Sequence, residues 1–191
     1  MKDRRRGVLA VKKVVIGLGN TLLSDDGVGI YTVRALKERL DGMADVIEAE
    51  LAGLDLIEKL EGYDRAFIID AIQLEGEEPG SVFRMRPDDI RATPRLASCH
   101  DVDLVTAMEL GRRLKLIMPA EVFIYAIQVA DAHTLSEGCL PPVEQIIPAL
   151  ADEIAGEIKG EPFNRISKTL AERKGKTNTW ALSYEKRTGY S

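Results

Sequence analysis

Side chains that could bind a metal ion or activate water lie in three segments of this sequence. The acidic pair Asp25 and Asp26 lies in residues 17–29, GLGNTLLSDDGVG, between an apolar β-branched run and a helical pattern. Asp70 ends a second apolar run, and His100 lies just before a later helical pattern. Two carboxylates and one imidazole suit nickel, zinc or iron and leave coordination positions open for substrate and water. The residue types therefore indicate a site that holds a divalent metal ion or activates water.

The hydrophobic pattern predicts strands that alternate with helices, and these elements must position the candidate residues. Strands are predicted at 11–18, 46–50, 65–70, 81–85 and 121–129, and helices at 30–40, 54–60, 101–114 and 141–160. We expect the strand at 81–85 to lie at a sheet edge, Pro148 to kink or split the last helix, and Gly160 to end it. The alternation predicts an α/β fold, a three-layer αβα sandwich around a mainly parallel, twisted sheet.

The predicted topology brings the candidate residues to one edge of the sheet. In an open parallel sheet, ligands bind beyond the carboxyl ends of the strands, and Asp26, Asp70 and His100 all map to that edge. Each also has an ordinary structural role open to it: a turn or helix cap, a loop cap and a solvated helix start, respectively. Their coincidence at one edge favours a shared site. His133, in the loop after the last strand, shares this edge and suits a surface loop.

Other kinds of site find less support in the sequence. A dinucleotide-binding turn needs a third glycine at position 22, where Leu22 stands. Cys99 beside His100 suggests a cysteine protease, but adjacent side chains in an extended loop point apart, and no orienting residue is identifiable. Cys99 and Cys139 are the two cysteines, too few for a disulfide framework or a zinc finger. No G-x-S-x-G or H-E-x-x-H motif occurs.

Composition and charge narrow the class of protein. The chain has 191 residues, 45% of them hydrophobic and 30% charged, which predicts one globular domain over residues 1–160. Residues 161–191 form a basic C-terminal extension that we expect to be partly ordered. The net charge is −5, with −14 in residues 14–160, so an acidic body argues against nucleic-acid binding. The apolar runs are too short for membrane insertion and no secretory signal is evident, so the expected location is the cytoplasm.

Three motifs in this order resemble those of the nickel-iron hydrogenase maturation endopeptidases. They are V-V-I-G-L-G-N-T-L-L-S-D-D-G-V-G, F-I-I-D-A-I and S-C-H-D-V-D-L, and the resemblance covers roughly residues 13–158. The first motif is the most specific, because it is much longer than a chance glycine pattern. One departure is the stretch I-E-A-E-L-A-G, which retains only Ala52 and Gly53 of the family's glycine-rich turn after the second strand.

The resemblance implies a phosphorylase/hydrolase-like sandwich and an aspartyl-type endopeptidase. Its partner would be a hydrogenase large-subunit precursor, from which it removes the C-terminal extension after nickel insertion. Asp26, Asp70 and His100 would be the catalytic and nickel-recognising residues, and Asn20 and Gly27 would bind substrate. Nickel is expected to be carried by the substrate, and a metal of the protein's own stays open.

Two other functions remain open at the level of sequence. The same residues would serve a free-standing metal-dependent hydrolase of a small amide or peptide. A non-catalytic hydrogenase assembly chaperone would bind the precursor without shortening it.

Overall fold

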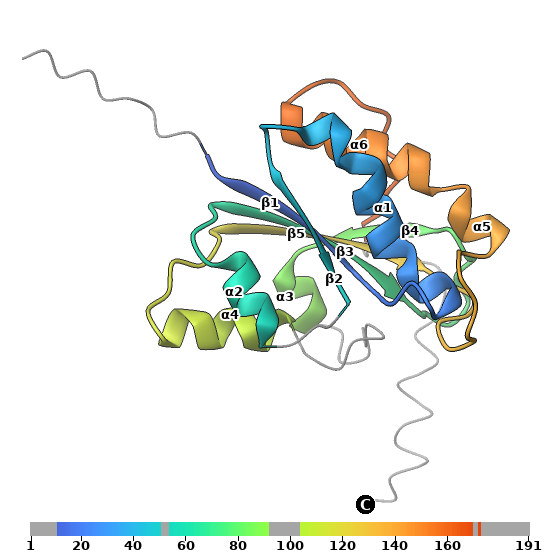
Figure 1. Ribbon diagram of the computed structural model, residues 1–191, viewed down its shortest axis with the longest axis horizontal. Coiled ribbons are helices and arrows are strands. Elements are labelled where there is room, and N and C mark those ends of the chain that lie inside the picture. The colour runs from blue at the N-terminus through green and yellow to red at the C-terminus, as the bar shows by residue number, and fades with distance from the viewer. Residues whose placement is uncertain (1–10, 51–53, 92–103, 170–171, 173–191) are drawn as a thin grey trace, which may run out of the picture.

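The protein contains a five-stranded sheet with helices on both faces, as a computed structural model describes for residues 11–50, 54–91, 104–169 and 172 (Figure 1). The strands are β1 Lys13–Leu18, β2 Asp45–Ala49, β3 Arg65–Ile72, β4 Val82–Met85 and β5 Glu121–Gln128. The helices are α1 Val28–Leu36, α2 Asp55–Leu60, α3 Pro87–Arg91, α4 Leu104–Arg113, α5 Pro141–Glu144 and α6 Ile147–Lys159, with 3-10 turns η1 Ser24–Gly27 and η2 Glu38–Leu40. The strand order is β2-β1-β3-β5-β4, and β4 alone is antiparallel to its neighbour among these strands.

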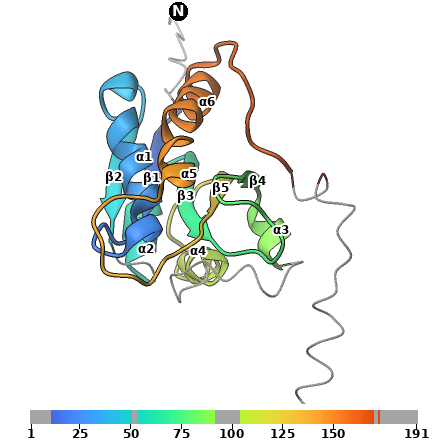
Figure 2. The ribbon, with the colours of Figure 1, turned by 90° about the vertical axis from the view of Figure 1, so that its right-hand side faces the viewer.

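The helices form two layers that enclose the sheet. Figure 1 shows α1, α5 and α6 on one face and α2, α3 and α4 on the other, and the turned view in Figure 2 agrees. Helix α1 packs against α6, and α2 packs against α4. The predicted three-layer sandwich with a mainly parallel sheet is therefore confirmed. No helix in the described part of the chain has both the length and the hydrophobicity needed to cross a membrane.

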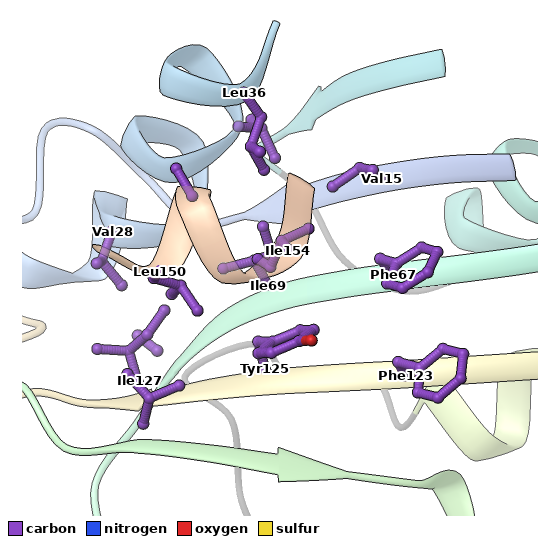
Figure 3. Packing of buried hydrophobic residues seen from close by; sticks show 14 of the residues in the cluster. Val15, Val28, Leu36, Phe67, Ile69, Phe123, Tyr125, Ile127, Leu150 and Ile154 are labelled. Atoms are coloured by element: carbon purple, nitrogen blue, oxygen red, sulfur yellow. The ribbon is translucent and has the colours of Figure 1, made fainter. Parts of the chain in front are cut away.

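The central strands are buried on both faces, as parallel strands between two helical layers must be. Phe67 and Phe123 face α1 and α6 and stack with ring centroids 5.1 Å apart, beside the buried Tyr125 (Figure 3). Ile68 and Ile124 face the opposite way, into the cluster under α2 and α4. The period-two alternation of strand side chains thus supplies both cores from the same two strands.

Several features of the fold differ from the pattern in the sequence, refine it or agree with it. Helix α3 was not predicted, and α1 ends at Leu36, where η2 follows. The last predicted helix is split into α5 and α6, with Pro148 in the first turn of α6, where a missing N–H costs no hydrogen bond. Gly160 ends α6 in the left-handed conformation, with φ of 72°, as expected. Strand β4 lies at the edge of the five strands, as expected, and it is antiparallel to β5 because the connection from β3 is too short for the crossover that a parallel strand needs.

Residues 161–169 continue beyond α6 to the outer edge of β4. The backbone N–H of Lys168 donates to the Val82 carbonyl, and the N–H of Arg84 donates to the Lys168 carbonyl, both at 2.8 Å. These two bonds form a parallel bridge between Phe83 and Lys168. The edge strand is therefore paired on its outer side by a short piece of the chain itself.

A buried carboxylate fixes this piece of chain in place. Glu153 of α6 is fully buried, and its side chain accepts hydrogen bonds from the N–H groups of Ile166 and Ser167, at 2.7 and 2.9 Å, and from the Ser167 hydroxyl. Since an unpaired buried carboxylate is costly, Glu153 requires the segment to stay docked.

A second glutamate, one turn further along α6, links that helix to the edge of the sheet. The side chain of Glu157 accepts hydrogen bonds from Nε and Nη2 of the Arg84 guanidinium and from the Tyr125 hydroxyl, the last at 2.7 Å. Burial disfavours the charged carboxylate, but the hydrogen bonds from Arg84 and Tyr125 outweigh it and hold the pKa of Glu157 below its ordinary value. The charged form of Glu157 therefore stabilises the folded protein.

We expect the substitution Glu157→Gln to lower the free energy of unfolding at neutral pH and to matter less in acid. The stabilisation by the charged carboxylate is fully present above the ordinary pKa of 4.5 and is lost as pH falls through the lower pKa of the folded state. Urea unfolding followed by circular dichroism, from about pH 7 down to about pH 3, measures this difference between wild type and variant. Glu161→Gln, at an exposed position, is the control. A difference that stays constant with pH would contradict the prediction.

Candidate functional site

Helix α1 begins in direct backbone contact with the carboxyl ends of two central strands. A Cβ atom on Gly29 would lie 2.2 Å from the carbonyl oxygen of Leu18 in β1 and 2.4 Å from that of Ile69 in β3. Gly19 has φ of 142°, and a Cβ there would lie 2.0 Å from the Asp26 carbonyl oxygen. Glycine at these positions therefore lets η1, which carries the acidic pair, sit against β1 and β3.

The Asp26 side chain is held by the loop that precedes it. Its Oδ2 accepts a hydrogen bond of 2.8 Å from the backbone N–H of Asn20, and Asn20 Oδ1 in turn accepts the N–H of Leu22 at 3.0 Å. Gly27 is buried, and a Cβ there would lie 2.8 Å from Cε2 of the Tyr31 ring. Asn20 and Gly27 thus shape the turn around Asp26, and their predicted contact with substrate stays a prediction.

Asp70 lies near the carboxyl end of β3 and is almost entirely buried. Its Oδ1 accepts the N–H of Ala71 at 2.8 Å, and its position in the alternation is that of Ile68 and Ile72, which face the α2 and α4 layer. The turn η1 packs against β3. The structure thus brings the turn with Asp26 and the strand with Asp70 together at one edge of the sheet.

Asp25 has a role that its sequence neighbours do not reveal. Its carboxylate is fully buried and accepts the backbone N–H groups of Ala130, Asp131 and Leu140, at 3.1, 3.2 and 2.6 Å. Its own N–H donates to the Asp131 carbonyl at 3.0 Å. These partners lie 105 to 115 residues away in the sequence, so no local pattern could indicate them. Of the acidic pair, Asp25 anchors the loop after β5.

The same loop also binds the residues just before the acidic pair. Ser24, with φ of 45°, donates its N–H to the Ser136 carbonyl at 2.8 Å, and the Ser136 N–H donates to the Leu22 carbonyl at 3.0 Å. Non-glycine residues seldom adopt a positive φ, and Ser24 keeps it because both of its flanks are tied down. The acidic turn is therefore fixed by three segments: the preceding loop, β3 and the loop after β5.

The remaining candidate residues divide into those that the structure describes and those outside it. His100 and Cys99 lie outside the described residues. His133 is exposed, and its backbone N–H donates to the Asp131 side chain at 3.0 Å. Burial, together with the negative charges of Asp25 and Glu144, raises the pKa of the Cys139 thiol to about 12, so this cysteine is protonated near neutral pH and is a poor nucleophile.

Within the described residues, no group of three or more histidine, cysteine, aspartate or glutamate side chains is placed to hold a metal ion. The predicted set of three includes His100, which is not among those residues. Asp26 and Asp70 are carboxylate ligands of the kind that divalent cations accept, and together with an imidazole they suit nickel.

A mostly parallel α/β sandwich with buried aspartates at the carboxyl edge of its sheet defines a class of protein that binds its ligand at that edge. Comparison with known proteins identifies the family. Residues 30–157 match a family model described as hydrogenase maturation protease. The chain therefore belongs to the hydrogenase maturation protease family, and it is a hydrolase.

Individual relatives agree with this assignment. The hydrogenase 2 maturation protease of Escherichia coli is 27% identical, over 74% of this chain and 88% of the relative. The hydrogenase expression/formation protein HupD of Bradyrhizobium diazoefficiens is 29% identical, over 83% of this chain and 85% of the relative. The solved [NiFe] hydrogenase maturation protease HybD from Thermococcus kodakarensis is 26% identical with a TM-score of 0.62, over 78% of this chain and 99% of that chain. The maturating endopeptidase HybD from Escherichia coli, at 21% identity and a TM-score of 0.66, supports the fold.

We expect Asp25→Asn to destabilise the protein by about 2 to 3 kcal/mol. In the wild type both carboxylate oxygens accept buried N–H groups, whereas the side-chain NH2 of asparagine would face one set of these donors and leave them without an acceptor. Asp131→Asn in the same loop is the matched control. The Asp131 Oδ1 atom accepts the N–H groups of His133 and Thr134, and an asparagine oxygen can do the same. Urea unfolding of both variants measures the change in free energy of unfolding. Equal stability of the two variants would contradict the anchoring role of Asp25.

Proposed function

We propose that this protein is an endopeptidase that removes the C-terminal extension of a nickel-iron hydrogenase large-subunit precursor after nickel has been inserted. Membership of the hydrogenase maturation protease family supports this proposal. The structural observation that carries it is the Asp26 carboxylate, held by the Asn20 N–H on a turn that packs against the strand bearing Asp70. The proposed location is the cytoplasm, and the two cysteines of the chain are compatible with a reducing compartment.

In this proposal, nickel is part of the substrate. Asp26, Asp70 and His100 recognise nickel that the precursor already holds, and they complete its coordination sphere. The negative potential of two aspartates at one sheet edge attracts a divalent cation, and their burial reduces screening by water. A precursor without nickel would bring no such cation to the site and would bind unproductively. The buried Asp25 keeps the acidic turn in position for this recognition.

The proposed chemistry needs no nucleophile on the protein. Nickel brought by the substrate can polarise the carbonyl of the scissile peptide bond or lower the pKa of a bound water, which then attacks that carbonyl. The role of Asp26, Asp70 and His100 is to orient the metal and the extension relative to each other. The protonated thiol of Cys139 is consistent with this division of roles.

We expect Asp26→Asn, Asp70→Asn and His100→Ala each to lower processing of the precursor by at least about 100-fold, since each removes one ligand of the metal. Mass spectrometry of the precursor after incubation measures processing, and thermal unfolding checks that each variant is folded. Cys99→Ser and Cys139→Ser are the matched controls and should process at the wild-type rate. Full activity in an aspartate or histidine variant would remove that residue from the site, and loss of activity in Cys99→Ser would restore a thiol mechanism.

Processing is expected to depend on nickel in the substrate. The precursor is prepared with and without nickel loaded by its assembly machinery, incubated with the protein, and weighed by mass spectrometry. We expect loss of a C-terminal peptide from the loaded sample alone. Cleavage of both samples would indicate a catalytic centre resident in the protein. Binding without cleavage of either sample would indicate an assembly chaperone, and cleavage of small amides instead would indicate a free-standing hydrolase.

A further inference from the structure

Two exposed leucines lie beside the acidic turn, on the two loops that meet there. Leu22 has 55% of its surface exposed, and Leu135 has 81%. Leu23 and Ser136 form a parallel bridge, which places Leu22 and Leu135 in register as neighbours across it. The Ser136 N–H donates to the Leu22 carbonyl at 3.0 Å. The two apolar side chains therefore belong to one surface, which we call the leucine pair.

The leucine pair is held in place by the buried structure beneath it. The Asp25 carboxylate accepts N–H groups from both ends of the loop 130–140, which carries Leu135. The Ser24 N–H donates to the Ser136 carbonyl at 2.8 Å and ties this loop to the segment that carries Leu22. Because these hydrogen bonds hold both loops in one conformation, the leucine pair loses little conformational entropy when a partner covers it.

The position and charge of the leucine pair indicate what would cover it. Leu22 lies four residues before Asp26, on the loop whose Asn20 N–H holds the Asp26 carboxylate, so the leucine pair lies beside the proposed catalytic residues. Asp131 and Glu137 in the same loop add negative charge, and His133 is the basic side chain between them. Such a surface favours an apolar side chain next to a basic one and disfavours an acidic peptide.

We propose that the leucine pair is the docking surface for an extended segment of the hydrogenase precursor beside the cleaved bond. The proposal rests on the proposed function and adds residues that determine substrate affinity without touching the reacting atoms. A partner that covers the two leucines removes their apolar surface from water, and this burial contributes to binding. Because this contact forms on binding and persists during reaction, its loss should raise KM and leave kcat unchanged.

Kinetics with single substitutions test the first part of the proposal. We expect Leu22→Ser and Leu135→Ser each to raise KM for the nickel-loaded precursor about tenfold, with kcat within about twofold of wild type. Leu114→Ser is the matched control, because Leu114 is 60% exposed but follows α4 on the way to the amino end of β5, at the opposite edge of the sheet. An unchanged KM in both variants, or an equal rise in Leu114→Ser, would overturn the proposal.

Cross-linking tests the identity of the partner and does not require cleavage. Leu135→p-benzoylphenylalanine is mixed with the nickel-loaded precursor, irradiated and digested, and the cross-linked peptide is identified by mass spectrometry, with Leu114→p-benzoylphenylalanine as control. We expect a cross-link within the precursor residues that flank the cleaved bond. A cross-link to a second copy of this chain, to a distant surface of the precursor, or to nothing would overturn the proposal. Wild-type protein that fails to cleave the precursor while the expected cross-link forms would overturn the proposed function alone.

Discussion

The close approach of helix α1 to the sheet is the constraint on which the candidate site depends. Gly29 lies against the carbonyl oxygens of Leu18 and Ile69, at distances that leave no room for a side chain. This contact fixes the start of the helix over β1 and β3, and the acidic turn immediately before the helix is fixed with it. Backbone-to-backbone packing of this kind is rigid because no rotatable side chain lies between the two elements. The position of Asp26 relative to Asp70 therefore depends on the glycine at position 29, which allows this close contact.

The acidic pair shows how neighbouring identical residues come to differ. Asp25 is surrounded by backbone N–H groups of a distant loop, whereas Asp26 accepts a hydrogen bond from Asn20, within the same loop and turn. The first arrangement supports the fold, and the second leaves the carboxylate at the edge where the sheet binds ligands. Family membership gives the activity of the protein, and this division assigns different roles to the two residues. A motif written as two adjacent acidic positions hides the difference.

The sequence allowed the layers, the five strands and the shared edge of Asp26 and Asp70 to be predicted, because these depend on local periodicity and on the rule that parallel strands end together. It did not reveal α3, because this helix has only 5 residues and its hydrophobic pattern is too short to detect. It also did not reveal the role of Asp25 or the docking of residues 166–168, since both rest on contacts between segments far apart in the chain. The burial of Glu153 in α6 could not be read from its residue type, because glutamate is rarely buried.

The pairing of Lys168 with β4 has a consequence for the boundaries of this protein. A shortened chain that stops at Gly160 would contain the five described strands and six described helices but would lose the cover on β4 and the hydrogen-bond donors of the buried Glu153. The outer N–H and C=O groups of β4 would then be open to strand addition from another molecule, which is the usual route to aggregation at a sheet edge. The segment after α6 thus protects the edge of the sheet, and the packed structure continues beyond the end of α6.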